Sequence, residues 1–232
     1  MKIKESLDNL CNNAGFFPHD LEHGLQYVKV MREAMAEVDL SGVTNWIMED
    51  YLLKTYSKSD KFTWLGSIEP FSAERPWTRA LEGKKVLVIH PFAATIEKQY
   101  ARRELLFENE DILPKFELKT VKAVQTIAGT KDERFETWFD ALEYMYQEAM
   151  KIDFDVAIIG CGAYGYPLAA KIKQAGKIAI HLGGVTQILF GIKGSRWEGI
   201  RSYRERMNEY WVKPDEDEKP QGSSKVEGGC YW

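Results

Sequence analysis

Residues 155–165 have the sequence DVAIIGCGAYG, in which a short apolar run leads into three glycines at Gly160, Gly162 and Gly165. A short apolar run that ends at a glycine is typical of a strand buried on both faces. Glycines at the first, third and sixth places match the pattern G-x-G-x-x-G, which connects a strand to a helix. The next helix is expected over residues 167–174, with Pro167 in its first turn. This stretch therefore predicts a strand, a glycine turn and a helix in succession.

Strands alternate with helices on both sides of this unit. Further strands are expected at 84–90, 116–121 and 177–181, and further helices at 94–107, 135–150 and 185–190. Apolar strands that alternate with helices indicate a parallel sheet covered on both faces. The predicted fold class is therefore α/β, with a Rossmann-like parallel sheet flanked by helices. Right-handed crossovers place all the strand carboxyl ends at one edge, where sheets of this type bind ligands.

The rest of the chain predicts two additions to this sheet. Residues 1–80 are expected to form a helical lobe and an aromatic linker, with helices over 20–39 and 44–56 and Asp20 as an N-cap. Residues 81–212 are expected to be the Rossmann-like nucleotide-binding domain. Residues 213–232 are rich in charged residues, proline and glycine, which favours a flexible charged tail; the alternative is that its end, Cys230-Tyr231-Trp232, docks. We expect five aromatic residues to gather where the lobe meets the sheet: Trp46, Trp64, Phe71, Trp77 and Phe92.

Composition excludes several classes of protein. The 31 basic and 35 acidic residues give a net charge of −4, which argues against a nucleic-acid binder. An aromatic content of 12% rules out a disordered chain. Neither a signal peptide nor a membrane span is recognisable, so we expect a cytoplasmic protein, and a homo-oligomer is compatible with the sequence. Cys11, Cys161 and Cys230 form no CxxC pair, so a disulfide framework and a cysteine-built zinc site are unsupported.

The glycine turn has two interpretations. Glycines at these places let the backbone approach a pyrophosphate at a helix N-terminus, where free N–H groups favour anions. Alternatively, Gly160, Gly162 and Gly165 serve only close packing between strand and helix. A nicotinamide site needs an acidic residue at the end of the next strand, but that strand ends in HLGG at 181–184. A nicotinamide-dependent oxidoreductase is therefore the weakest of the functions considered.

Other candidate residues follow neighbouring strands. His90 and His181 end two predicted strands, and histidine has an ordinary pKa near working pH, so both are candidate catalytic residues. The alternative is that each is a histidine satisfied by backbone groups at a strand end. Gly183 and Gly184 are expected beside the Gly160 turn, on the nucleoside side of the ligand.

A basic, glycine-spaced loop and a histidine pair complete the candidates. Lys193 and Arg196 are expected to offset phosphate charge, and Trp197 to stack on a base or sugar ring. His19 and His23 stand four residues apart without the glutamate of an HExxH motif, so they are interpreted as surface residues. We assign no metal ligand.

The stretch from 155 to 197 resembles the C-terminal half of the GT-D type glycosyltransferases. The likeness rests on the glycine turn, a helix that ends at Gly176, and a strand that closes in IHLGG, where that family has I-D-I-G-H. The chain also resembles bacterial proteins encoded among polysaccharide genes, through the blocks VLVIHPF, GCGAYGYPLAA, HLGG, FGIKGSRW and VEGGCYW. The resemblance implies transfer of a sugar from a UDP- or GDP-linked donor to a glycan acceptor, with a divalent cation (Mn²⁺ or Mg²⁺).

One part of the family pattern is not recognised. GT-D enzymes carry an acidic D-x-E motif near their N-terminus, which holds the metal and the diphosphate, and we do not identify one before residue 80. Either the acidic loop has been lost with a truncated N-terminus, or the chain is inactive or has another function. The leading hypothesis is a nucleotide-sugar-dependent glycosyltransferase, or a nucleotide-sugar-binding relative, of bacterial surface polysaccharide synthesis. The alternative is a non-catalytic binding or scaffold subunit of a glycan-assembly system.

Overall fold

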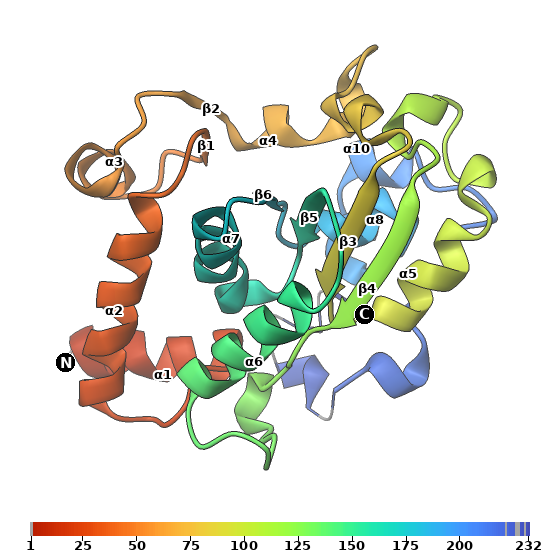
Figure 1. Cartoon of the computed structure of the whole chain (residues 1–232). Helices are drawn as coiled ribbons and strands as arrows, with labels where there is room; N and C mark the ends of the chain where they lie inside the picture. The colour runs from red at the N-terminus through yellow and green to blue at the C-terminus, as the bar shows by residue number, and fades with distance from the viewer. Residues whose placement is uncertain (1, 221, 226–227, 230) are drawn as a thin grey trace.

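The main sheet has four parallel strands. The computed structural model describes residues 2–220, 222–225, 228–229 and 231–232. The strands lie in the order β4-β3-β5-β6 (Figure 1), with the bounds β3 (Lys85–His90), β4 (Glu117–Lys122), β5 (Val156–Ile159) and β6 (Ile178–His181). Because Ile89 pairs with Ile159, and Ile159 with His181, the carboxyl ends of β3, β5 and β6 align at one edge. The predicted α/β fold with a parallel sheet is confirmed.

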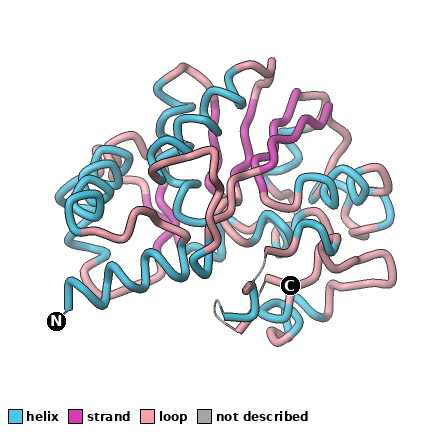
Figure 2. The backbone as a smooth tube through the Cα atoms, turned by 90° about the horizontal axis from the view of Figure 1, so that it is seen from below, coloured by secondary structure: helices cyan, strands magenta, loops and turns pink. Residues whose placement is uncertain are grey.

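Helices cover both faces of this sheet (Figure 2). Their bounds are α5 (Ala93–Tyr100), α6 (Trp138–Met150), α7 (Gly165–Gln174) and α8 (Val185–Leu189). In β3, Val86 and Val88 contribute to one hydrophobic cluster with α5 and α8, whereas Leu87 and Ile89 contribute to a second cluster with α6 and α7. All four side chains are fully buried. Burial on both faces explains why the strands have continuous apolar sequences rather than alternating ones.

Helices α5 and α6 differ from their expected bounds by three or more residues at one end. Helix α6 starts at Trp138, because the side chains of Thr137 and Asp140 form a capping box that fixes its first turn. Helix α5 ends at Tyr100, since Arg102 leaves the helical region (φ −124°, ψ 29°) and donates from Nε to Gln99 Oε1 at 2.8 Å. Within the described ranges, no helix combines the length and apolar character needed to cross a membrane.

The N-terminal residues form a helical lobe with a small sheet that the sequence does not predict. Its elements are α1 (Lys2–Ala14), α2 (Leu21–Met35), β1 (Ser41–Val43), α3 (Glu49–Tyr56), β2 (Phe62–Trp64) and α4 (Leu65–Ile68), and β1 pairs with β2 in parallel. Asp20 caps α2, as expected, by accepting from the His23 backbone N–H at 2.9 Å. Helix α3 starts later than expected because the Glu49 carboxylate accepts from the Thr44 and Trp46 backbone N–H groups. The domain boundaries at 80 and 212 stay predictions.

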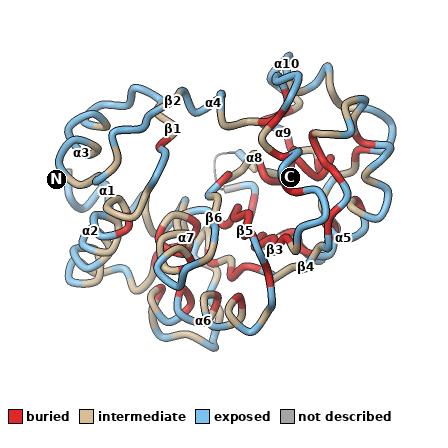
Figure 3. The backbone as a smooth tube through the Cα atoms, turned by 45° about the horizontal axis from the view of Figure 1, so that its top comes forward, coloured by how far each residue is buried: buried red, intermediate tan, exposed pale blue. Residues whose placement is uncertain are grey.

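The expected gathering of aromatic residues at the lobe junction is wrong in part. Phe71 and Phe92 are buried, but Trp46 is 76% and Trp64 60% exposed. Figure 3 shows buried backbone concentrated in β3, β5 and the elements around them, with much of the N-terminal lobe exposed. Trp46 lies in the turn before α3 and Trp64 ends the short strand β2, and neither belongs to the hydrophobic clusters on the two faces of the main sheet.

The C-terminal segment packs against helix α5, whereas the sequence predicts a flexible tail. Glu218 is 4% exposed, and its carboxylate accepts from the Ala94 N–H (2.8 Å), the Thr95 N–H (3.2 Å) and Thr95 Oγ1 (2.5 Å). These are free donors of the first turn of α5, which has no side-chain cap of its own. Lys98 forms an ion pair with Asp215 nearby. Tail and helix are thus joined by charge-assisted hydrogen bonds.

We predict that Glu218→Gln lowers the free energy of unfolding by about 1–2 kcal/mol, because the amide loses the negative charge that stabilises the α5 N-terminus. Urea unfolding followed by circular dichroism measures the difference. Glu216→Gln is the matched control, since Glu216 is exposed and two residues away. Equal losses for the two variants would show that the Glu218 cap does not hold the tail.

Candidate functional site

A pocket of about 120 Å³ lies at the carboxyl edge of the sheet, between the ends of β3 and β5. From β3 the chain continues to β4 on one side of β3, and then crosses over to β5 on the other side. The direction in which strands are added to the sheet therefore reverses between β3 and β5. Ligands of open α/β sheets bind at such a switch point. The walls come from the end of α1, the segments after β3, β4 and β5, helix α8 and the last two residues of the chain.

Each glycine of the turn after β5 has a different role. A Cβ on Gly160 would lie 2.6 Å from Gly183 O and 2.7 Å from His90 Cδ2, so this position has no room for a side chain. A Cβ on Gly165 would lie 2.5 Å from the His181 ring, so this glycine permits close contact between α7 and β6. Gly162 differs: its φ is +57° and a Cβ would meet nothing within 4 Å. Two glycines therefore serve packing, and Gly162 presents bare backbone to the pocket.

His90 lines the pocket as a neutral hydrogen-bond donor. Its Nδ1 accepts from the Phe92 backbone N–H at 3.0 Å, so the ring proton of the neutral form is on Nε2. Burial lowers the pKa of His90 to about 3, because the charged imidazolium is poorly solvated there. At neutral pH the ring donates through Nε2–H, and it is not poised for the acid–base role expected from the sequence.

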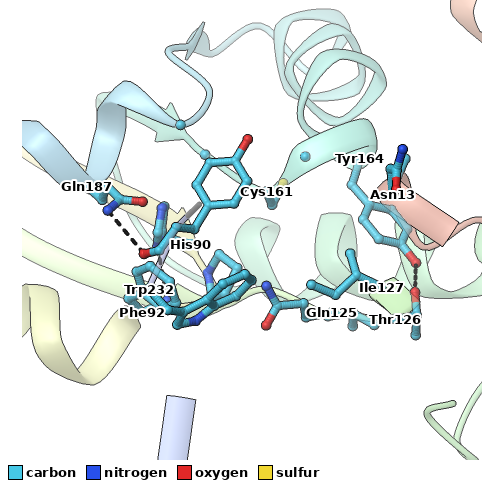
Figure 4. Close-up of a pocket in the computed structure, with 17 residues that line it drawn as sticks. Asn13, His90, Phe92, Gln125, Thr126, Ile127, Cys161, Tyr164, Gln187 and Trp232 are labelled. Carbon is cyan, nitrogen blue, oxygen red and sulfur yellow. Dashed lines mark hydrogen bonds between the residues drawn. The ribbon is translucent and has the colours of Figure 1, made fainter. Parts of the chain in front are cut away.

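Two aromatic walls face each other across the pocket (Figure 4). On one side Trp232 packs against Phe92, with ring centroids 6.1 Å apart. On the other side Tyr164 stacks on Trp138 at 4.6 Å, and its hydroxyl lies 3.3 Å from Thr126 Oγ1. These rings offer flat apolar surfaces to a ligand ring.

The structure brings together four of the ten residues expected at the site. His90, Gly160, Gly162 and Gly184 line the pocket. The other six do not: His181, Gly165, Gly183, Lys193, Arg196 and Trp197.

The basic loop after α8 lies behind the pocket wall rather than in it. Trp197 is 6% exposed and packs against Tyr203 at 4.9 Å, so its ring is not free to stack on a ligand. Arg196 donates to the Tyr231 hydroxyl at 3.1 Å and covers the face of that ring. The Lys193 backbone N–H donates to Val212 O at 2.7 Å. Arg196 therefore holds the ring of Tyr231 in place, and Tyr231 lines the pocket.

The described pocket lining contains no aspartate, glutamate, lysine or arginine. Its polar side chains are neutral amides and hydroxyls and the neutral His90. Cys161 also lines it, and burial raises the pKa of this thiol, so the sulfur is not a thiolate at neutral pH. The site is thus built to hold a ligand by hydrogen bonds and ring contacts.

Residues 1–80 do contain one D-x-E triplet, Asp20-Leu21-Glu22, contrary to the expectation that this segment has none. The Asp20 carboxylate is engaged at the start of α2, where it accepts from His23 N and contacts His23 Nδ1 at 2.9 Å. His19 contacts Asp8 instead. Over the described ranges, no group of three or more His, Cys, Asp or Glu side chains is placed to hold a metal ion.

Several pocket residues have no signal in the sequence. Asn13 and Thr126 lie in segments without a motif, and they meet because Thr126 Oγ1 donates to Gly15 O at 2.6 Å. Tyr231 and Trp232 belong to the segment interpreted as a flexible tail, and Cys230 lies outside the described residues. Gln187 follows the predicted Gly183-Gly184 turn closely, and the sequence could have indicated this position.

The sheet order, the switch-point pocket and the glycine turn define a doubly wound α/β protein with a ligand site at its carboxyl edge. The model of the GT-D fold-like domain matches residues 69–189, and the chain belongs to this family. The suspected GT-D resemblance is thereby confirmed, and the protein is related to glycosyltransferases. Searches of curated proteins and of solved structures find no match.

We predict that His90 stays neutral down to about pH 4. Histidine ring signals in NMR spectra, assigned by comparison with His90→Gln, should show no titration of His90 between pH 8 and 5. Because the folded pKa lies below the unfolded value of about 6.5, the unfolded state binds more protons as pH falls from about 6.5 to 3. The His90 contribution to stability is therefore complete above pH 6.5 and is lost below it. Titration of His90 near pH 6.5 would contradict this assignment.

Proposed function

We propose that this protein binds a nucleotide sugar in the switch-point pocket and transfers the sugar to a glycan acceptor. The observation that carries the proposal is Gly162, whose bare backbone with positive φ opens onto the pocket at the carboxyl edge of a GT-D fold-like domain. The role fits a cytoplasmic enzyme of bacterial surface polysaccharide synthesis that uses a UDP- or GDP-linked donor.

The turn after β5 is the place for the diphosphate. Gly162 begins a short 3-10 turn that leads directly into α7, a helix of ten residues. Free backbone N–H groups and the helix dipole favour negative charge there. During transfer, the bond from the anomeric carbon to the diphosphate oxygen breaks while the acceptor hydroxyl oxygen bonds to that carbon, and the hydroxyl proton passes to the departing diphosphate. The leaving diphosphate gains negative charge, which N–H donors at Gly162 would stabilise.

The divalent cation implied by the family does not fit the described residues. Carboxylate oxygens are the ligands that Mg²⁺ prefers, and the described pocket lining has none. Asp20 and Glu22, which form the one D-x-E triplet before residue 80, lie outside that lining. A requirement for Mn²⁺ or Mg²⁺ therefore depends on acidic ligands supplied from elsewhere.

A non-catalytic binding subunit is the second candidate function. The specific observation in its favour is the chemistry of the described lining, where His90 is a neutral donor and no carboxylate is available as a general base. Such a subunit would bind the nucleotide sugar without turning it over. This candidate is favoured if the wild type transfers no sugar to an acceptor and the Gly162→Asp variant captures less of a protein partner in a pull-down.

We predict that Gly162→Asp weakens binding of nucleotide sugars at least tenfold, because a carboxylate would stand beside the diphosphate. Gly162→Asn is the matched control: asparagine has the same shape and tolerates positive φ, but it carries no charge. It should lose less affinity than the aspartate variant. Calorimetric titration of UDP- and GDP-sugars, with and without Mn²⁺, measures both.

Two outcomes would contradict the proposal. If the wild type gives no heat with any UDP- or GDP-sugar under either condition, the protein does not bind nucleotide sugars. If aspartate and asparagine at position 162 lose affinity equally, the diphosphate does not lie at this turn.

A further inference from the structure

The side chain of Gln187 has a buried oxygen without a partner. Gln187 is fully buried in α8 and lines the switch-point pocket (Figure 4). Its Oε1 atom has no hydrogen-bond partner in the part of the chain that the structure describes. A buried acceptor that has lost water without gaining a donor is unfavourable, so such an atom calls for an explanation.

The orientation of the Gln187 amide is fixed by its neighbours. Its Nε2 donates to Ile192 O at 3.3 Å and to Tyr231 O at 3.4 Å. Both neighbours are carbonyl oxygens, which can only accept. A flipped amide would place Oε1 against these two acceptors, so Nε2 must face them and Oε1 must stay unpaired.

His90 complements Gln187 on the same side of the pocket. The Phe92 N–H occupies His90 Nδ1, so the proton of the ring is on Nε2 and the ring can only donate. The pocket therefore offers one fixed acceptor and one fixed donor to a ligand. A ring hydroxyl satisfies either, because it both donates and accepts. An ionised phosphate has only acceptor oxygens and cannot satisfy Gln187 Oε1.

We infer that Gln187 is a specificity-determining residue that accepts a hydrogen bond from a hydroxyl group on an uncharged ring of the ligand. This inference rests on the proposed function. It also sets which end of the nucleotide sugar lies at Gln187 and which end lies at Gly162. The uncharged ring is at the Gln187 end, beside Phe92 and Trp232, and the diphosphate is at the Gly162 turn. A hexose and a ribose both carry the required hydroxyl group.

The test replaces Gln187 by methionine, which has a similar shape but no acceptor. The matched control is Gln99→Met. Gln99 is also fully buried, and its Nε2 also donates to two carbonyl oxygens, Gly191 O and Tyr210 O. Its Oε1 is paired, however, because it accepts from Arg102 Nε at 2.8 Å. Gln99 lies outside the pocket lining.

Calorimetry with UDP-glucose, uridine and pyrophosphate as probes gives the expected pattern. Gln187→Met should weaken UDP-glucose binding at least tenfold and leave pyrophosphate binding within twofold of wild type. An unchanged uridine affinity assigns the hydroxyl to the hexose, and a parallel loss assigns it to the ribose. Thermal unfolding should show a smaller loss for Gln187→Met than for Gln99→Met, which removes a paired oxygen.

Other results overturn the inference and separate it from the proposed function. If wild type and Gln187→Met bind UDP-glucose equally, Gln187 sets no specificity, while the proposed function stands. If Gln187→Met is as unstable as Gln99→Met or fails to fold, its oxygen has a structural partner. If the wild type binds none of the three probes, the proposed function fails together with the inference.

Discussion

The close contact at Gly160 is the constraint on which the site depends. This residue directly follows β5, and its backbone N–H still donates to Ile89 O in β3 at 2.9 Å. Three segments converge on it: His90 at the end of β3, Gly183 after β6 and Thr186 in α8. Any side chain here would separate them, because two of the nearest atoms would lie only 2.6 Å from its Cβ. The packing that closes the sheet edge also places His90, Gly162 and Gln187 around one pocket.

The family domain supplies only part of this pocket. Its match covers residues 69–189, which include His90, the glycine turn and Gln187. Asn13 comes from α1 and Trp232 from the end of the described chain, and both lie outside that match. The pocket is thus lined by residues of the N-terminal lobe and the C-terminal segment as well as by residues of the family domain. Glu218 contributes to this at a distance, since it ties the C-terminal segment to the first turn of α5.

The sequence predicts what depends on neighbours along the chain. The strands β3, β5 and β6 and the N-cap at Asp20 follow from apolar runs, glycines and a capping residue within a few positions. The sequence does not predict contacts between distant residues. The small β1–β2 sheet consists of two three-residue strands, which are too short to give a recognisable periodicity, and Glu218 caps a helix more than a hundred residues away. Lys193 and Arg196 follow the pattern of phosphate-binding residues, but neither lines the pocket, and Arg196 donates to the Tyr231 hydroxyl instead.

We expect the ligand to bind at the carboxyl ends of β3 and β5. A crystal structure of the protein grown with UDP-glucose tests this most directly. We predict a bound molecule with its diphosphate against Gly162 and an uncharged ring between His90 and Gln187. A molecule bound instead against Lys193 and Arg196, outside the pocket lining, would contradict it.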